Sequence, residues 1–116
     1  MKREMDLIRL LLIQVESGEK PEAMSDYTEE QILYHCELAI EAGLLDGKVL
    51  RGGPGGVVSA RLRKLTWEGH EFLDAARSET IWNQAKETVK KTGGSWTMEG
   101  LKLVLFEFVR QSLTGQ

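Results

Sequence analysis

Apolar positions at the start of the chain follow a helical period. Residues 2–17 carry apolar side chains over a face wider than the ~100° of a surface helix, at Leu7, Ile8, Leu10, Leu11, Leu12, Ile13 and Val15. Gly18 is a suitable C-terminal stop, and the polar stretch 19–27 that follows has no clear period. The pattern therefore predicts a broadly buried helix and then a loop, with a short helical turn within residues 19–27 as an open alternative.

A capping box opens the second predicted helix. In Thr28-Glu29-Glu30-Gln31, the threonine hydroxyl can accept a hydrogen bond from the backbone N–H of Gln31, whose side chain can reach back. The helix runs to about Ala42, and Gly43 ends it where a left-handed residue is needed. Its apolar side is opposed by a mostly acidic side, made of Glu30, Tyr34, Glu37 and Glu41.

Two alternating runs around a glycine-rich turn predict a β-hairpin. Residues 44–50 form the first strand, with an irregularity at Asp46-Gly47, and residues 57–66 form the second. The sequence between them, Gly52-Gly53-Pro54-Gly55-Gly56, is typical of a turn. In the second strand, alternation places one set of side chains on each face: Val58, Ala60, Leu62 and Lys64 on one, and Val57, Arg61, Arg63 and Leu65 on the other.

Further helices are predicted after the hairpin. Thr66 is a suitable N-cap for a helix to about Ala76, and a second helix continues from residue 78 or 79 to Lys91. Ser95 or Thr97 caps the last helix, over residues 98–112. The three tryptophans are expected to be core or interface anchors: Trp67, Trp82 and Trp96.

The last predicted helix is apolar on two sides. One face has Leu101, Val104, Leu105 and Phe108. The other face carries Leu103, Phe106, Val109 and Leu113. Because such a helix must bury both faces, we expect the second face to form a homodimer interface, or the helix to be sandwiched within a compact monomer.

The order of these elements is that of a winged helix-turn-helix. A capped helix ending in Glu41-Ala42-Gly43-Leu44-Leu45 leads directly into a glycine-tipped hairpin, and residues 35–44 resemble the recognition-helix stretch of many winged-helix regulators. We therefore expect an α+β fold, a winged helix-turn-helix with a β-hairpin wing and additional C-terminal helices. It would be one domain over residues 1–116, with a core at about 2–76 and a helical extension at about 78–113.

Several separated motifs resemble one family more closely. The opening MKREMDLIR, Tyr34-His35, Ala42-Gly43-Leu44 and the stretch LTWEGHEFLD at 65–74, with Trp82 further on, are similar in order to domain of unknown function 2513, an uncharacterised bacterial and phage family. The resemblance covers most of the chain. It implies a winged-helix fold and an association with prophage or mobile-element genes, and it assigns no catalytic or binding residue.

The composition of the chain mainly excludes classes of protein. The 116 residues are 41% hydrophobic and 28% charged, as in an ordinary globular domain. The single cysteine, Cys36, excludes an intramolecular disulfide and fits a reducing compartment. No apolar run approaches the ~18 residues of a membrane span, so we expect a cytoplasmic protein without a membrane partner.

The charge is uneven along the chain. Residues 1–50 carry 5 Lys and Arg against 11 Asp and Glu, whereas residues 51–116 carry 10 against 7. A basic footprint for nucleic acid must therefore lie in the second half. This distribution argues mildly against strong, general DNA binding.

Candidate DNA contacts come from two elements. The second helix offers Gln31, Tyr34 and His35, at the N-terminal end that enters the major groove in winged helices. The wing offers cations for the phosphate backbone: Arg51, Arg61, Arg63 and Lys64. The alternatives are an acidic helix face that is solvated or binds a protein, and an ordinary solvated hairpin with basic edges.

Catalytic and metal chemistry lacks a motif. His35, His70 and Cys36 show no metal-ligand spacing, and the glycine-rich turn lacks the Gly-Lys-Ser/Thr ending of a phosphate-binding loop. We therefore predict a non-enzymatic protein without cofactor or metal. The predicted function is DNA binding or transcription regulation, with double-stranded DNA as the partner. The alternative is a protein–protein interaction module that has the same scaffold but does not bind DNA.

Overall fold

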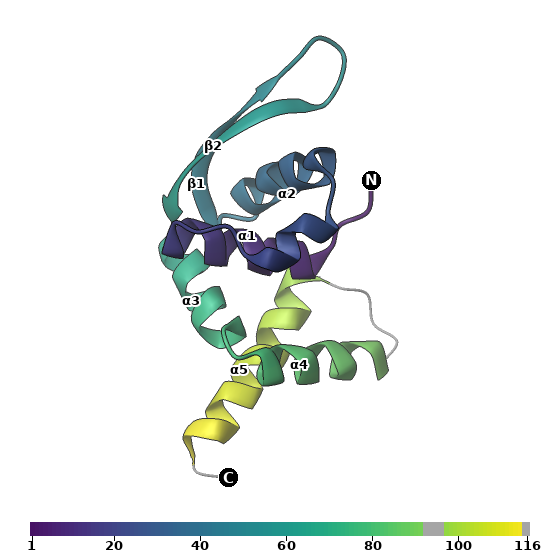
Figure 1. The fold of residues 1–116 in the computed structure, drawn as a ribbon. Helices are drawn as coiled ribbons and strands as arrows, with labels where there is room; N and C mark the ends of the chain where they lie inside the picture. Colours follow the sequence, from purple (N-terminus) through teal and green to yellow (C-terminus); the bar gives the residue numbers. More distant parts are fainter. Residues whose placement is uncertain (92–96, 115–116) are drawn as a thin grey trace. The chain divides into compact units, whose positions relative to one another are not determined.

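The computed structural model describes residues 1–91 and 97–114 (Figure 1). Within them the chain is a mixed α+β protein with five α-helices, one 3₁₀ helix and a two-stranded antiparallel sheet. In chain order the elements are α1 (Met5–Ser17), η1 (Glu22–Asp26), α2 (Glu29–Glu41), β1 (Leu45–Arg51), β2 (Val57–Leu65), α3 (Trp67–Ala76), α4 (Glu79–Lys91) and α5 (Met98–Leu113). They form two compact units, Met1–His70 and Glu71–Gln116.

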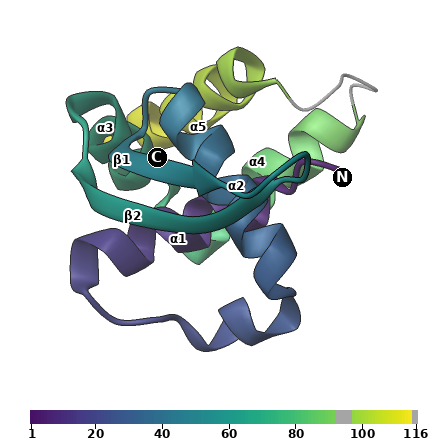
Figure 2. The ribbon, with the colours of Figure 1, turned by 90° about the horizontal axis from the view of Figure 1, so that it is seen from above.

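The first unit packs two helices against one face of the hairpin. Figure 2 shows the hairpin over α2, with α1 beside β2. The core between them is apolar and draws on every layer: Leu7 and Leu11 from α1, Met24 from η1 and Cys36 from α2, with Ala60 and Leu62 of β2 packed against them. The expectation that Cys36 is a small core residue is confirmed, since it is 4% exposed.

Helix α1 ends as the sequence predicts but begins later. Gly18 adopts φ 80°, and its N–H donates to the carbonyl of Gln14. The helix begins at Met5 rather than at residue 2, because Glu4 is in an extended conformation and caps the first turn with its carbonyl. The short helix η1 lies in the stretch that had no clear period.

Both ends of α2 form the predicted caps. Thr28 Oγ1 accepts from the Gln31 N–H at 3.1 Å, and Gln31 Oε1 accepts from the Thr28 N–H at 2.9 Å. At the other end Gly43 has φ 76°, and the Leu44 N–H donates to the carbonyl of Ala39. This is a Schellman motif, which releases the chain directly into β1.

Two register shifts correct the predicted alternation of β2. Leu50 pairs with Ser59 and Arg51 with Val57, and a second shift lies between Asp46 and Gly47. Each extra residue on β2 reverses the alternation beyond it. Val58 is consequently 53% exposed and Leu65 is buried, so the predicted faces of these two residues were wrong.

Thr66 and Gly69 fix the beginning of α3 against the α2–β1 turn. The Thr66 N–H donates to the carbonyl of Leu44, its hydroxyl donates to the carbonyl of Gly43, and it accepts from the Gly69 N–H. A Cβ on Gly69 would lie 2.0 Å from the carbonyl oxygen of Leu44. Glycine is therefore required here by the close approach of two backbones.

The second unit is built on packing between α4 and α5. Trp82 on α4 is buried, and its ring meets that of Phe72 edge-on, with centroids 6.1 Å apart. The prediction of an anchoring tryptophan is thus confirmed for Trp82. Trp67, in the first unit, is 77% exposed and is no core residue, and Trp96 lies outside the described residues.

Candidate nucleic-acid interface

The first residue expected to read bases, Gln31, is engaged within its own helix. Its Oε1 atom accepts the Thr28 N–H in the capping box. Bidentate pairing with adenine uses both the oxygen and the nitrogen of a glutamine amide. Gln31 is thus available for such a contact only if the N-terminal cap of α2 opens.

His35 is fully buried, so its prediction as a DNA contact is wrong. The Glu4 N–H donates to Nε2 of His35 at 2.7 Å. Because a backbone N–H can only donate, Nε2 is the acceptor and Nδ1 carries the proton, which it donates to the carbonyl of Gln31 at 2.7 Å. The imidazole therefore joins the start of α1 to α2 and has a structural role.

Tyr34 lies in a groove between α2 and the hairpin tip. The groove has a volume of about 430 Å³, and its lining includes Glu30, Tyr34, Glu37, Arg51 and Val58. The tyrosine ring is half-buried and packs edge-on against the ring of His35, with centroids 5.5 Å apart. Among Gln31, Tyr34 and His35, only Tyr34 is partly exposed and has a side chain without a hydrogen-bond partner in the described part of the chain.

Arg51 forms an ion pair with Glu37 across this groove. Its positive charge is therefore compensated within the protein. Glu29 and Glu30 are also exposed on the first turn of α2, and no cation pairs with them among residues 1–91 and 97–114. The face of α2 that would enter a major groove is thus acidic, as the sequence suggested.

The predicted wing cations differ in whether they form an ion pair with a carboxylate. Arg63 Nε donates to Asp46 Oδ2 at 2.7 Å, so its charge is also partly compensated. Arg61 and Lys64 are exposed and have no ion pair within the described part of the chain. The hairpin register places Lys48 directly opposite Arg61.

We call Lys48, Arg61 and Lys64 the hairpin cations. Arg61 lies between Ala60 and Leu62, whose side chains pack on the core, so it lies on the opposite face of the strand. Lys48 was not among the candidates, because only the strand pairing shows that it shares this face. Adding the paired Arg63 and Asp46 gives four cations and one carboxylate on this part of the hairpin.

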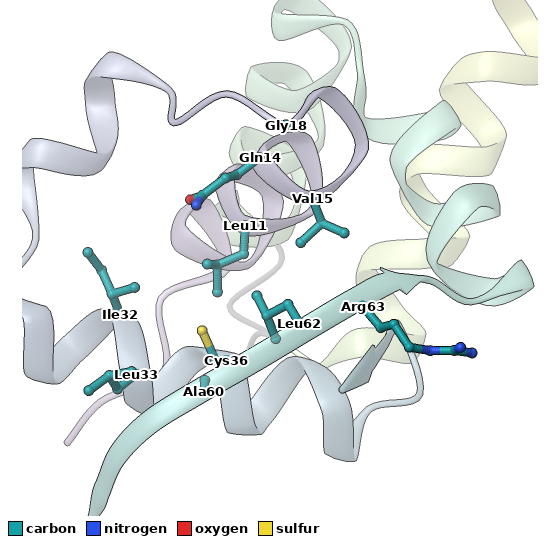
Figure 3. A pocket seen from close by; sticks show the side chains of 10 residues that line it. All are labelled: Leu11, Gln14, Val15, Gly18, Ile32, Leu33, Cys36, Ala60, Leu62 and Arg63. Atoms are coloured by element: carbon teal, nitrogen blue, oxygen red, sulfur yellow. The ribbon is translucent and has the colours of Figure 1, made fainter. Parts of the chain in front are cut away.

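An open pocket of about 460 Å³, lined by apolar residues together with Gln14 and Arg63, lies between α1, α2 and β2 (Figure 3). The Cys36 thiol points toward the space beside Leu11 and Leu62, whereas the Arg63 guanidinium points away. Burial raises the pKa of Cys36 to about 11, so the thiol is protonated at neutral pH and is a weak nucleophile. Within the described ranges no three His, Cys, Asp or Glu side chains are grouped as metal ligands would be.

The two faces of α5 differ in burial. Leu101 and Leu105 are buried. The opposite face leaves Leu103 at 72%, Phe106 at 44% and Leu113 at 82% exposure, with Val109 half-buried. The predicted dimer-interface residues therefore form an apolar stripe on the surface.

A family model described as "Hypothetical protein (DUF2513)" matches residues 2–95. The chain belongs to this family. A relative from Haemophilus influenzae, described as "Uncharacterized protein", is 33% identical over 97% of this chain and 99% of its own length. The resemblance of the sequence motifs to domain of unknown function 2513 is thus confirmed.

No solved structure matches the chain. None of the helices in residues 1–91 and 97–114 is long and apolar enough to cross a membrane. The descriptions of the family model and of the relative name no ligand or activity.

Proposed function

We propose that the first unit is a winged helix that binds the phosphate backbone of duplex DNA through the outer face of its hairpin. The order α1, η1, α2 and hairpin supports the winged-helix assignment. The observation that carries the proposal is that Lys48 and Arg61 lie directly opposite each other on the two strands. Both side chains are exposed, and neither has a carboxylate partner in the described chain. The proposed function is non-enzymatic.

Electrostatics favour the hairpin over α2 as the contact. The exposed first turn of α2 carries Glu29 and Glu30, which phosphates would repel, and Gln31 is held in the capping box. Contacts to phosphates position a protein on DNA and carry no direct sequence information. We therefore expect weak, salt-sensitive binding with little preference for sequence.

Salt dependence tests the proposal directly. Fluorescence anisotropy of a labelled random-sequence duplex would be followed between about 50 and 200 mM salt, since each phosphate contact contributes about 0.9 to the slope of log K against log salt. Replacing both opposed cations, in Lys48→Gln with Arg61→Gln, should lower the slope by about 1.8. The matched control, Lys90→Gln with Lys91→Gln, removes two exposed cations at the end of α4.

The expected result is a loss of affinity and slope in the hairpin variant alone. Equal losses in both variants would indicate attraction by net charge and contradict a hairpin site. An unchanged slope in the hairpin variant would also refute the proposal. Circular dichroism of both variants would check that the fold is retained.

One observation favours a protein partner as the second candidate. The lining of the groove beside Tyr34 includes an exposed acidic residue, Glu30, and an arginine, Arg51, whose charge is compensated by its ion pair with Glu37. Such a groove suits an extended segment with a basic side chain. A short arginine-containing peptide should shift the amide resonances of Tyr34 and Glu30, and the substitution Glu30→Gln should weaken binding of this peptide. Unchanged resonances on addition of the peptide would refute this candidate.

A further inference from the structure

The open pocket between α1, α2 and β2 combines apolar walls with an amide side chain. Most of its lining is apolar: Leu11, Val15, Ile32, Leu33, Ala60 and Leu62. The Gln14 side chain, from α1, is half-buried at this pocket, and its amide has no hydrogen-bond partner in the described part of the chain. A ligand in the pocket can therefore bond to this amide without breaking a contact of the protein.

The Gln14 amide and the Cys36 thiol point into the same space (Figure 3). The amide extends from α1 toward Ile32, and the thiol points into the space from α2. Burial raises the pKa of Cys36 to about 11, so the thiol is uncharged at neutral pH and offers a weak S–H donor. The Arg63 guanidinium points away from the space and donates to Asp46. The groups that face the space are therefore apolar or uncharged.

We propose that this pocket binds a small, uncharged aromatic heterocycle whose edge carries a hydrogen-bond donor beside an acceptor, as adenine does. A glutamine amide has an oxygen acceptor and a nitrogen donor, and it pairs with both groups of such an edge. The apolar side chains of Leu11 and Ile32 contact the ring. The volume of about 460 Å³ is within the range of pockets that bind small molecules, which are mostly apolar and have few polar groups.

The site is separate from the hairpin cations and does not depend on DNA binding. Ala60 and Leu62 line the pocket on the core-facing side of β2, whereas Arg61 lies on the opposite face of the strand. All of the lining residues belong to the first unit. Loss of DNA binding in a hairpin variant would therefore leave the ligand pocket intact.

The charge of the lining favours a ligand without a phosphate or carboxylate. Arg63 is the charged residue of the lining, and its ion pair with Asp46 already compensates it. Moving an ionised group from water into an apolar site without a counter-charge is costly. For a ligand as small as adenine, with about ten non-hydrogen atoms, we expect a Kd on the order of 1 mM.

A titration of the ¹⁵N-labelled protein with adenine tests the ligand and the site together. The backbone amide resonances of Gln14, Cys36 and Ala60 should shift and approach saturation by about 5 mM adenine. The side-chain NH₂ resonances of Gln14 should shift as well, because they report directly on the proposed hydrogen bond. Unchanged resonances, or shifts centred on the hairpin cations, would overturn the proposal.

The substitution Gln14→Leu tests the role of the amide. It removes the donor and the acceptor and should weaken adenine binding by about 10-fold. Indole has a similar bicyclic ring with a single donor, so its binding should change by less than about 2-fold, which also shows that the variant is folded. The matched control, Gln84→Leu, makes the same change at an exposed position of α4 and should bind adenine like the unmodified protein. Unchanged adenine binding in Gln14→Leu, or equal losses of adenine and indole, would contradict the proposal.

A comparison with adenosine monophosphate tests the preference for an uncharged ligand. This nucleotide has the same base edge as adenine and adds a phosphate. We expect it to bind no more tightly than adenine, because the lining offers the phosphate no uncompensated cation in the described part of the chain. Tighter binding of the nucleotide would indicate a phosphate site and overturn the proposal.

Discussion

Replacing Gly69 by alanine should destabilise the protein far more than the same change at Gly100. The two glycines occupy equivalent positions, since each donates its N–H to the hydroxyl of a threonine N-cap at 3.0 Å. At Gly69 a Cβ would lie 2.0 Å from the Leu44 carbonyl oxygen, whereas at Gly100 it would meet only the Thr97 hydroxyl, at 3.0 Å. Comparing the two alanine variants therefore distinguishes the effect of backbone crowding, present only at Gly69, from the effects of helix propensity and capping, which are common to both positions.

The size of the destabilisation in Gly69→Ala depends on how far the start of α3 must move away from Leu44. Bringing a carbon and an oxygen from 2.0 Å to an ordinary contact of about 3.3 Å shifts the start of α3 by more than an ångström. That shift breaks the two hydrogen bonds from Thr66 to Leu44 and Gly43, each worth about 0.5–1.5 kcal/mol. Overpacking adds about 1–3 kcal/mol, and the better helix propensity of alanine returns at most about 1 kcal/mol.

We expect Gly69→Ala to lower the free energy of unfolding by about 2–4 kcal/mol, and Gly100→Ala to change it by less than about 1 kcal/mol. Urea unfolding followed by circular dichroism measures both values. Hydrogen exchange of the Leu44 amide, which bonds to Ala39, reports on the turn locally. Equal stability of Gly69→Ala and the unmodified protein would refute the close approach of α3 to the α2–β1 turn.

Other predictions concern single side chains. His35→Leu should lower the unfolding free energy by about 1–3 kcal/mol in urea, because it leaves a backbone N–H without its acceptor, whereas His70→Leu, at an exposed site, should change it by less than about 0.5 kcal/mol. The Cys36 thiol should react with iodoacetamide much more slowly at pH 8 in the native protein than in urea. The pKa of Cys36, about 11, is higher than the pKa of about 8.5 of a thiol in the unfolded chain. The protonated thiol therefore contributes its full stabilisation below about pH 8.5, and this contribution is lost as the pH rises toward 11. Urea unfolding curves recorded across this pH range measure the loss. In the DNA assay, Arg51→Gln should reduce the salt slope less than Arg61→Gln, because the Arg51 charge is already compensated; equal reductions would contradict this reasoning.

Features that depend on neighbouring residues could be predicted from the sequence. The capping box at Thr28 and the left-handed Gly43 were confirmed, because their hydrogen bonds lie within a few residues of the chain. The buried face of α5, including Leu101 and Leu105, was confirmed because helical periodicity determines which residues share a side. Local hydrogen bonding and periodicity therefore gave the order and ends of most elements.

Features that depend on distant pairing could not be predicted in this way. The exposure of Val58 follows from a register shift in the hairpin, and the burial of His35 follows from the N–H of Glu4, 31 residues away. Lys48 became a candidate only when the strand pairing placed it opposite Arg61. The ion pair between Arg51 and Glu37 likewise joins residues whose proximity no periodicity indicates.

The most direct test of the hairpin interface is to locate where DNA contacts the protein. Uniformly ¹⁵N-labelled protein would be titrated with a random-sequence duplex at about 50 mM salt, where weak phosphate contacts are strongest, while the amide resonances are followed. We predict shifts centred on the hairpin cations Lys48, Arg61 and Lys64, with the first turn of α2 unchanged. Shifts centred on Glu30 and Tyr34, or no shifts at millimolar duplex, would contradict the account.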